Sequence, residues 1–271
     1  MIDELVIYDK HQSWIHKLKF VLTLRKKKYD LVVDLRHTAI PYLVQAKKRS
    51  PLLRVGKILP LHEKHLAILK QMNLSTDHSK ALDFFNEAEE LQVRKLLQTQ
   101  GLQLEDSWIL IAPFAASELK TWSLSGFQKL IPMLLKEFPG KMILAGGQRE
   151  KTMMDSLARI DTSRIVVFAG QTTLRELAAL IKYASLLIVN DSSALHLGYE
   201  MDRPTVGIFG PTDPKLSGRI GPNFRIAQHT APCVPCEKAH CQIERRVCLD
   251  DLSAETVFKA CQELLTYAAH S

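Results

Sequence analysis

From residue 107 onward, short apolar runs alternate with stretches of helical periodicity. Runs of strand length, each closed by Gly, Pro or Asp, occupy residues 107–114, 141–147, 164–170, 185–191 and 205–211. Such bounded runs are typical of buried strands. The intervening residues 124–138, 149–160, 173–184 and 192–201 predict helices. Strands that alternate with helices build a parallel sheet covered on both faces, so the pattern predicts an α/β fold.

Two helices carry the clearest periodicity. Leu174, Leu177, Ala178 and Ile181 are spaced i, i+3, i+4, i+7 and therefore share one helix face. Residues 253–269 read as an amphipathic terminal helix with Ser253 as its N-cap.

The N-terminal part of the chain is less regular. Residues 28–35 predict a short buried strand that ends near Asp34, and residues 62–74 predict a helix. Residues 82–101 are polar, acidic and helical in pattern, with Gly101 as the stop signal. We therefore expect a partial N-terminal domain at 1–102 and a second domain at 103–271.

Two polar turns follow the fourth and fifth apolar runs, within residues 190–221. In an α/β sheet, the ligand crevice lies at the carboxyl ends of the strands. Asp191, Ser192 and Ser193 precede a helix. We expect them to cap it and to leave its first N–H groups facing the crevice, where they form an anion site.

The chain of 271 residues is long enough for a substantial core. It contains no run of 18 apolar residues and does not open on a signal-peptide pattern, which favours a cytoplasmic location. The net charge of +7 includes dense basic clusters at 25–28 and 47–49. These clusters are either solvated helix ends or a contact for a phosphorylated ligand or an anionic membrane surface. Nucleic acid is disfavoured because aromatic residues are not interleaved with the charges.

Four of the five cysteines are crowded into one stretch. Cys233, Cys236, Cys241 and Cys248 follow a C-x2-C-x4-C-x6-C spacing, with His229 and His240 nearby. In a cytosolic chain such crowding favours a structural zinc site over disulfides, although the spacing is not that of a standard zinc finger or ribbon. The alternative is a loop of free or partly buried thiols.

Residues 173–214 resemble glycosyltransferase family 9, the ADP-heptose:lipopolysaccharide heptosyltransferases and their relatives. The family pattern is an Asp-Ser/Thr-Gly turn, a His about four residues later and a Phe/Tyr-Gly-Pro-Thr-Asp-Pro loop. The resemblance extends over essentially the whole chain and is firmest at 107–222. The matching residues are Asp191-Ser192-Ser193, His196, Phe209-Gly210-Pro211-Thr212-Asp213-Pro214, Lys120-Thr121-Trp122 for the family's Lys-x-Trp, and Ala145-Gly146-Gly147.

Two departures from the family pattern have consequences. Ser193 stands where the family usually has Gly, which would cost about 1 kcal/mol or more if that position needed a positive φ. In addition, the chain begins about 28 residues ahead of the segment that resembles the end of the family's N-terminal domain. The Gly-containing loop whose Asp is proposed as the family's catalytic base is therefore not seen. The resemblance thus predicts a truncated N-terminal domain and identifies no catalytic residue.

The resemblance implies a GT-B fold with two Rossmann-like domains. It also implies that the terminal helix, about 254–270, packs back on the N-terminal domain, and that no cofactor is required. The implied donor-binding residues are Lys120, Asp191, Ser192, Ser193, His196, Thr212 and Asp213. Each has a plainer reading: a turn lysine, a helix cap, a core histidine, or a well-made turn bracketed by prolines.

The resemblance further implies inverting transfer of a heptose, or a related sugar, from a nucleotide sugar such as ADP-heptose. The acceptor would be the lipopolysaccharide core at the inner membrane surface, and the basic clusters suit it. Two alternatives stay open: a catalytically impaired remnant that binds nucleotide sugars, and a non-sugar α/β nucleotide-binding enzyme.

Overall fold

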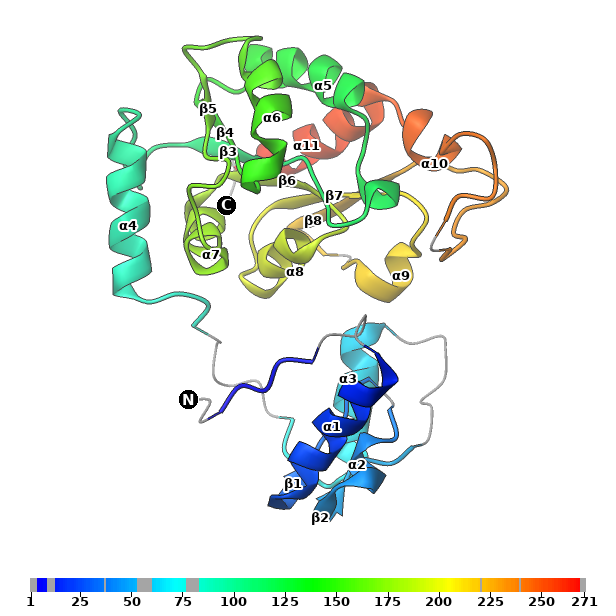
Figure 1. Ribbon diagram of the computed structural model, residues 1–271. Helices are drawn as coiled ribbons and strands as arrows, with labels where there is room; N and C mark the ends of the chain where they lie inside the picture. The colour runs from blue at the N-terminus through cyan, green and yellow to red at the C-terminus, as the bar shows by residue number, and fades with distance from the viewer. Residues whose placement is uncertain are drawn as a thin grey trace. The chain divides into compact units, whose positions relative to one another are not determined.

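The computed structural model describes residues 4–8, 13–36, 38–52, 60–76, 83–219, 221–238 and 240–268. The chain forms two compact units, Met1–Ala81 and Leu82–Ser271 (Figure 1). Both contain parallel strands and helices, which confirms the predicted α/β class. Among the described residues, none of the helices has the length and apolar character needed to cross a bilayer.

In the first unit, the predicted strand and helix both form, but the strand is not buried. Leu31 is 40% exposed and Val33 is 36% exposed. The prediction of a buried strand is wrong because the described sheet of this unit has only two strands, which cannot cover their own faces. The elements are α1 (Trp14–Arg25), β1 (Lys28–Val32), α2 (Ile40–Leu43), β2 (Gln45–Arg49) and α3 (Leu61–Gln71).

The two basic clusters lie in different local structures. Arg25 ends α1 and Lys28 begins β1, and all four side chains of the cluster at 25–28 are exposed, which is compatible with both readings. The cluster at 47–49 lies in β2 and not at a helix end. There the Lys47 ammonium pairs with Asp30 on β1, and both side chains are more than 80% exposed (82% and 88%).

The second unit is a six-stranded parallel sheet in the order β5-β4-β3-β6-β7-β8. All five predicted strands form. The sixth was not predicted, because Arg225 and Gln228 interrupt its apolar character. The strands are β3 (Trp108–Ala112), β4 (Lys141–Leu144), β5 (Ile165–Val167), β6 (Leu186–Asn190), β7 (Thr205–Phe209) and β8 (Phe224–Gln228).

Helices cover both faces of this sheet (Figure 1). Ile109 and Ile111 of β3 pack into one core with α5 (Leu124–Glu137), α6 (Lys151–Ala158) and α11 (Ala254–Ala268). Leu110 packs into the other core with α4 (Glu87–Gln98), α7 (Leu174–Tyr183) and α8 (Ser193–Glu200). This alternation is what the pleat of a strand produces. The remaining elements are η1 (Glu118–Lys120), η2 (Gln148–Glu150), α9 (Pro214–Ser217) and α10 (Val247–Asp250).

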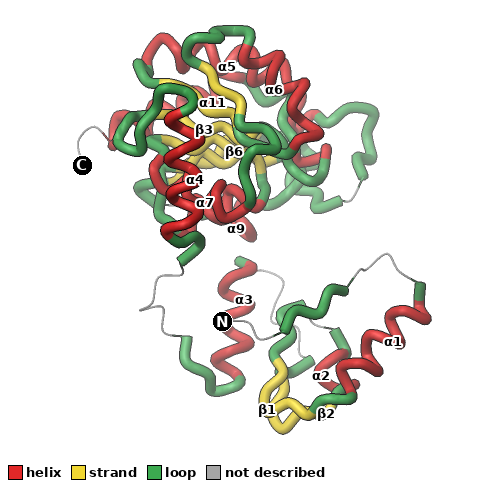
Figure 2. Tube along the Cα trace, turned by 60° about the vertical axis from the view of Figure 1, so that its left-hand side comes forward, coloured by secondary structure: helices red, strands yellow, loops and turns green. Residues whose placement is uncertain are grey.

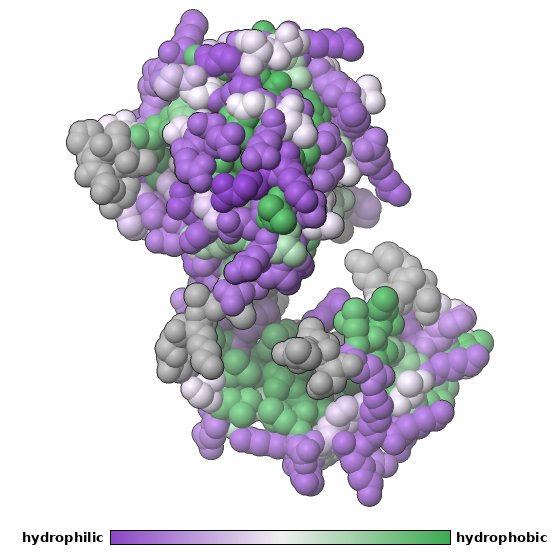
Figure 3. All heavy atoms as spheres, turned by 90° about the vertical axis from the view of Figure 1, so that its left-hand side faces the viewer, coloured by the Kyte–Doolittle hydropathy of each residue, from purple (hydrophilic) through white to green (hydrophobic). Residues whose placement is uncertain are grey.

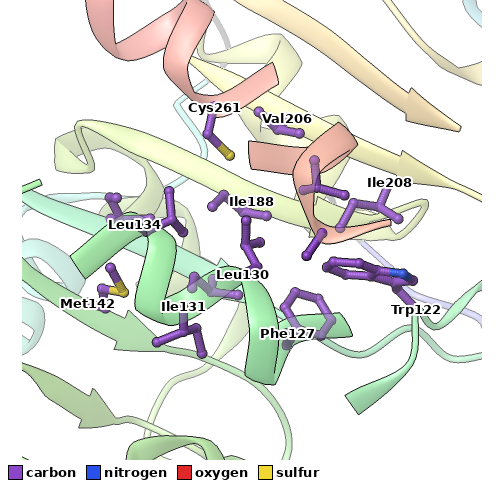
Figure 4. Packing of buried hydrophobic residues seen from close by; sticks show 14 of the residues in the cluster. Trp122, Phe127, Leu130, Ile131, Leu134, Met142, Ile188, Val206, Ile208 and Cys261 are labelled. Atoms are coloured by element: carbon purple, nitrogen blue, oxygen red, sulfur yellow. The ribbon is translucent and has the colours of Figure 1, made fainter. Parts of the chain in front are cut away.

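The terminal helix α11 belongs to the core of the second unit. Ser253 accepts a hydrogen bond from the Thr256 N–H, which confirms the predicted N-cap. Val257, Cys261 and Leu264 are fully buried or nearly so, in the core that contains α5 and strands β6 and β7 (Figure 4). The apolar face of the helix thus covers the sheet of the second unit, and the expectation that the helix packs back on the N-terminal domain stays a prediction.

Helix α4 also belongs to the second unit, where it lies beside α7 (Figure 2). Val93 and Leu97 are buried against the sheet, and Arg175 of α7 pairs with Glu89 at 2.6 Å. Gly101 has a φ of 64°, as expected of a helix stop signal. The expected boundary at 102 assigns α4 to the first domain, whereas the second compact unit begins at Leu82.

Candidate functional site

The strand order of the second unit reverses between β3 and β6, and a cavity lies at the carboxyl ends of these strands. In doubly wound sheets, ligands bind at this switch point. The cavity, called here the switch-point cavity, has a volume of about 510 Å³. It is lined by segments that follow β3, β4 and β6 and by the first residues of α7 and α8. Lys120, Asp191, Ser192 and Ser193 of the predicted set line it, as do Gly146 and Gly147.

An ion pair joins two predicted site residues that are far apart in the sequence. The Lys120 ammonium donates to an Asp191 carboxylate oxygen at 2.7 Å, and the Thr212 hydroxyl donates to the same oxygen at 2.7 Å. The Asp191 side chain is only 4% exposed, and that of Lys120 is 34% exposed. Asp191 therefore fixes the position of Lys120, whose ammonium retains access to the cavity.

The expected side-chain cap of α8 does not form. Ser192 occupies the N-cap position of α8, but its side chain makes no capping hydrogen bond, and Asp191 is turned to Lys120 instead. The first N–H groups of α8 consequently receive no side-chain cap and lie at the wall of the cavity. Ser193 is the first residue of the helix and is not among the residues with positive φ. The presence of Ser where the family has Gly therefore causes no backbone strain at this position.

Asn190 is a structural residue of the site that the sequence did not reveal. It is fully buried at the end of β6. The oxygen of its side-chain amide accepts a hydrogen bond from the backbone N–H of Trp122 at 2.9 Å, and the amide NH₂ donates to the Pro113 carbonyl at 2.7 Å. Trp122 is itself buried against Phe127 (Figure 4). Asn190 thus ties together the segments after β3 and β6 and the turn that carries Lys120.

Three predicted donor residues lie outside the cavity lining: His196, Asp213 and Thr212, the last of which reaches the site only through its bond to Asp191. His196 is exposed on α8, so neither the core reading nor direct contact with this cavity fits it. Asp213 caps α9 through the Lys215 N–H at 2.9 Å, and its own N–H donates to Glu237. Asp213 thus stabilises the turn that precedes α9, and its role in donor binding stays a prediction.

Apolar side chains also line the cavity, among them Phe114, Leu174 and Leu177. Leu174 shares a helix face with the buried Ala178 and Ile181, yet it is 59% exposed. An exposed leucine at the rim of a cavity is a surface that a ligand can cover.

The four crowded cysteines come together in the fold. Cys233, Cys236, Cys241 and Cys248 line one small cavity beside Pro211. Burial raises the pKa of the Cys248 thiol, and the other three cysteines raise it further. In the part of the chain that the structure describes, no three His, Cys, Asp or Glu side chains are already placed as ligands of one ion.

Comparisons with known proteins agree with this architecture. The family described as glycosyltransferase family 9 (heptosyltransferase) matches residues 17–246. Lipopolysaccharide heptosyltransferase 3 of Escherichia coli is 27% identical over 233 residues, which cover 76% of this chain and 67% of that protein. Of the first two curated relatives that this chain matches, the aligned part covers 47% of the length of one and 67% of the length of the other.

Solved structures share the fold. A crystal structure of a family 9 glycosyl transferase from Veillonella parvula has a TM-score of 0.73 at 21% identity, covering 98% of this chain and 83% of that one. The structure of E. coli heptosyltransferase WaaC with ADP has a TM-score of 0.64 at 19% identity, covering 92% of this chain and 77% of that one. With its doubly wound sheet, its switch-point cavity and a family match over most of its length, the chain belongs to glycosyltransferase family 9 and has the GT-B fold of the heptosyltransferases.

Proposed function

We propose that the switch-point cavity binds a nucleoside diphosphate sugar of the ADP-heptose type, and that the chain acts in transfer of that sugar to a lipopolysaccharide core. The observation that carries the proposal is that one cavity is lined by both cationic and apolar groups. Lys120 and the uncapped start of α8 supply positive charge and hydrogen-bond donors, and we take them as its cationic end; Leu174 and Leu177 supply apolar surface, and we take them as its apolar end. A nucleotide combines a charged diphosphate with a less polar nucleoside.

The cationic end suits the diphosphate. A helix N-terminus presents N–H donors and about half a unit of positive charge, and a lysine adds a full charge. Ser192 and Ser193 add hydroxyl donors from the same turn. Sugar transfer leaves negative charge on the departing diphosphate, and donors aimed at developing charge lower the barrier. Asp191 acts as a positioning residue, because its carboxylate holds the Lys120 ammonium in place. The negative charge of Asp191 is paired with that ammonium and therefore does not repel the diphosphate.

The apolar end suits the nucleoside. Phe114, Leu174 and Leu177 offer surface to a base, and the exposure of Leu174 would be removed by a bound ligand. The preference for adenine rests on the family, since a solved heptosyltransferase of this fold contains ADP. Among the described lining residues, the one carboxylate is Asp191, which is engaged by Lys120 and Thr212. We therefore expect the base that deprotonates the acceptor hydroxyl to be a residue outside the cavity.

For the acceptor, the proposal relies on charge and exposure in the first unit. Residues 1–81 contain 16 Lys and Arg against 7 Asp and Glu, a net charge of +9, while the rest of the chain sums to −2. In α1, which has no buried residue, Trp14, Leu18 and Leu22 are 72%, 51% and 48% exposed. Figure 3 shows apolar surface over this unit. Apolar side chains next to basic ones suit an anionic lipid surface.

Calorimetric titration of the chain with ADP-heptose, ADP and UDP-GlcNAc, followed by a transfer assay on truncated lipopolysaccharide, tests the donor proposal. We expect ADP-heptose to bind more tightly than UDP-GlcNAc and transfer to follow. Binding without transfer would favour the impaired remnant. No binding of any nucleotide sugar would contradict the proposal.

Vesicle sedimentation tests the acceptor side separately. The chain is expected to bind phosphatidylglycerol-containing vesicles at low salt and phosphatidylcholine vesicles weakly. Replacing Lys26, Lys27 and Lys28 by Glu should reduce binding about 100-fold, since each basic residue near such a surface contributes about 1 kcal/mol. The matched control replaces the exposed lysines 129, 136 and 182 of the second unit by Glu. Equal losses in the two triple variants would assign the effect to net charge alone.

A further inference from the structure

Gln228 is the last residue of β8 and one of the polar residues that interrupt the apolar character of that strand. It is half-buried, and in the parallel pairing of β7 with β8 it is the partner of Phe209, the last residue of β7. Removing an amide side chain from water is costly unless its polar groups find other partners. The amide of Gln228 therefore needs hydrogen-bond partners within the fold.

The amide NH₂ of Gln228 makes two hydrogen bonds to the turn that follows β7. It donates to the carbonyls of Gly210 and Thr212, both at 3.0 Å. An amide nitrogen carries two hydrogens, so it can serve two acceptors at once. The backbone of the turn is thus tied to the end of β8 on both sides of Pro211.

Glu237, in the loop after β8, holds other parts of the same turn. Its backbone N–H donates to the Pro211 carbonyl at 3.0 Å, and its carboxylate accepts a hydrogen bond from the Asp213 N–H at 2.6 Å. These contacts act on the residues before and after Thr212. Among the hydrogen bonds of the described residues, the one to the Thr212 carbonyl comes from Gln228.

The hydroxyl of Thr212 connects this turn to the ion pair of the switch-point cavity. It donates to the same Asp191 carboxylate oxygen that accepts from the Lys120 ammonium, and both distances are 2.7 Å. Threonine is stiff about its first side-chain torsion, so the position of its hydroxyl follows the position of its backbone. Gln228 therefore sets where the Thr212 hydroxyl lies. That hydroxyl in turn helps to fix the carboxylate that orients Lys120.

We propose that Gln228 is a positioning residue for the diphosphate site of the switch-point cavity. It does not line that cavity, and it acts on the Lys120 ammonium through Thr212 and Asp191. This role rests on the proposed function, since it requires that Lys120 contacts the diphosphate of a nucleotide. The amide that interrupts the apolar pattern of β8 thus serves the site and not the core.

Calorimetric titration of the full chain with ADP and with adenosine tests this role. Gln228→Ala should weaken ADP binding about threefold to tenfold and leave adenosine binding nearly unchanged, because the Lys120 contact is loosened and not removed. Thr212→Val lacks the hydroxyl and should weaken ADP binding by a similar factor, whereas Thr212→Ser keeps the hydroxyl and should bind ADP nearly as the unaltered chain does. In the Thr212→Val background, Gln228→Ala should add less than about a twofold loss, since both residues act through one contact. The Thr212 variants keep the test valid if Gln228→Ala does not fold.

The matched control is Gln262→Ala. Gln262 is also half-buried, and its amide NH₂ donates to both oxygens of the Glu137 carboxylate at 2.9 and 3.0 Å, but it lies on α11 and does not line the switch-point cavity. This variant should keep its ADP affinity, and thermal unfolding of each variant separates a general loss of stability from a loss of ADP affinity. The role of Gln228 would be overturned if Gln228→Ala bound ADP as the unaltered chain does, if it lost ADP and adenosine affinity equally, or if its loss were undiminished in the Thr212→Val background. Failure of the unaltered chain to bind ADP would contradict the proposed function itself, and this role with it.

Discussion

The two units of the molecule differ in how completely they bury their own sheets. In the second unit, every residue of β3, β6 and β7 is buried, and helices cover both faces. In the first unit, β1 and β2 contain no buried residue, and α1 contains none either. The charge is divided in the same way, with a net +9 in residues 1–81 and −2 in the remainder.

This difference separates what each unit can do. A rigid, fully packed sheet holds site residues in fixed positions, which is what recognition of a diphosphate requires. Asp191, Asn190 and Lys120 meet these conditions in the second unit. The first unit offers exposed apolar and basic surface instead, which suits a broad contact with a charged lipid. The proposal for donor binding therefore rests on the geometry of the second unit, and the proposal for acceptor binding rests on the charge and exposed surface of the first unit.

The largest expected effect concerns where the well-packed unit begins. A chain of residues 82–271 should be more stable than a chain of residues 103–271 by about 5 kcal/mol, since the shorter chain loses the buried Val93 and Leu97 of α4 and each such side chain contributes about 1.5–3 kcal/mol. Urea unfolding followed by circular dichroism measures the difference. Equal stabilities would show that α4 does not stabilise the second unit and would support the predicted domain boundary at 102.

The next effect concerns the buried amide that joins the site segments. Asn190→Ala leaves the backbone N–H of Trp122 and the Pro113 carbonyl without their partner, and each unsatisfied group costs about 1–3 kcal/mol. We expect the free energy of unfolding to fall by about 3 kcal/mol. Asn223→Ala is the control, because that amide makes a 3.3 Å bond at the surface. Similar losses for both variants would show that Asn190 has no special role.

A smaller effect depends on pH. Burial raises the pKa of Tyr199 to about 12, and its hydroxyl is buried with no hydrogen-bond partner among the described residues. The unfolded state ionises near pH 10, so stability is complete below that pH and falls as the pH rises toward 12, by about 2.7 kcal/mol. Tyr199→Phe should remove this part of the decline and leave stability at pH 7 nearly unchanged. A decline of the same size in the variant would assign it to other groups.

How much of the molecule could be predicted from its sequence depends on how far apart along the chain the interacting residues lie. Apolar runs with Gly, Pro or Asp at their ends specified five strands of the second unit, because burial on both faces leaves a local signature. β8 and β2 lacked that signature, whereas the apolar pattern at 28–35 predicted β1 but not its exposure. The ion pair of Lys120 with Asp191 spans 71 positions, and the bonds of Asn190 span 68 and 77. No local pattern records such contacts, so motif resemblance identified Lys120 and Asp191 but not their pairing.

The most direct test of the donor site is the difference between ADP and adenosine in their affinity for the Lys120→Ala variant, measured by calorimetry. Loss of one charge-assisted contact of about 1.5–3 kcal/mol should weaken ADP binding about 10- to 100-fold and leave adenosine binding nearly unchanged. Lys151→Ala is the matched control, since that ammonium pairs with Asp155 on α6. Equal losses for ADP and adenosine in Lys120→Ala would contradict the assignment of the diphosphate to this end of the switch-point cavity.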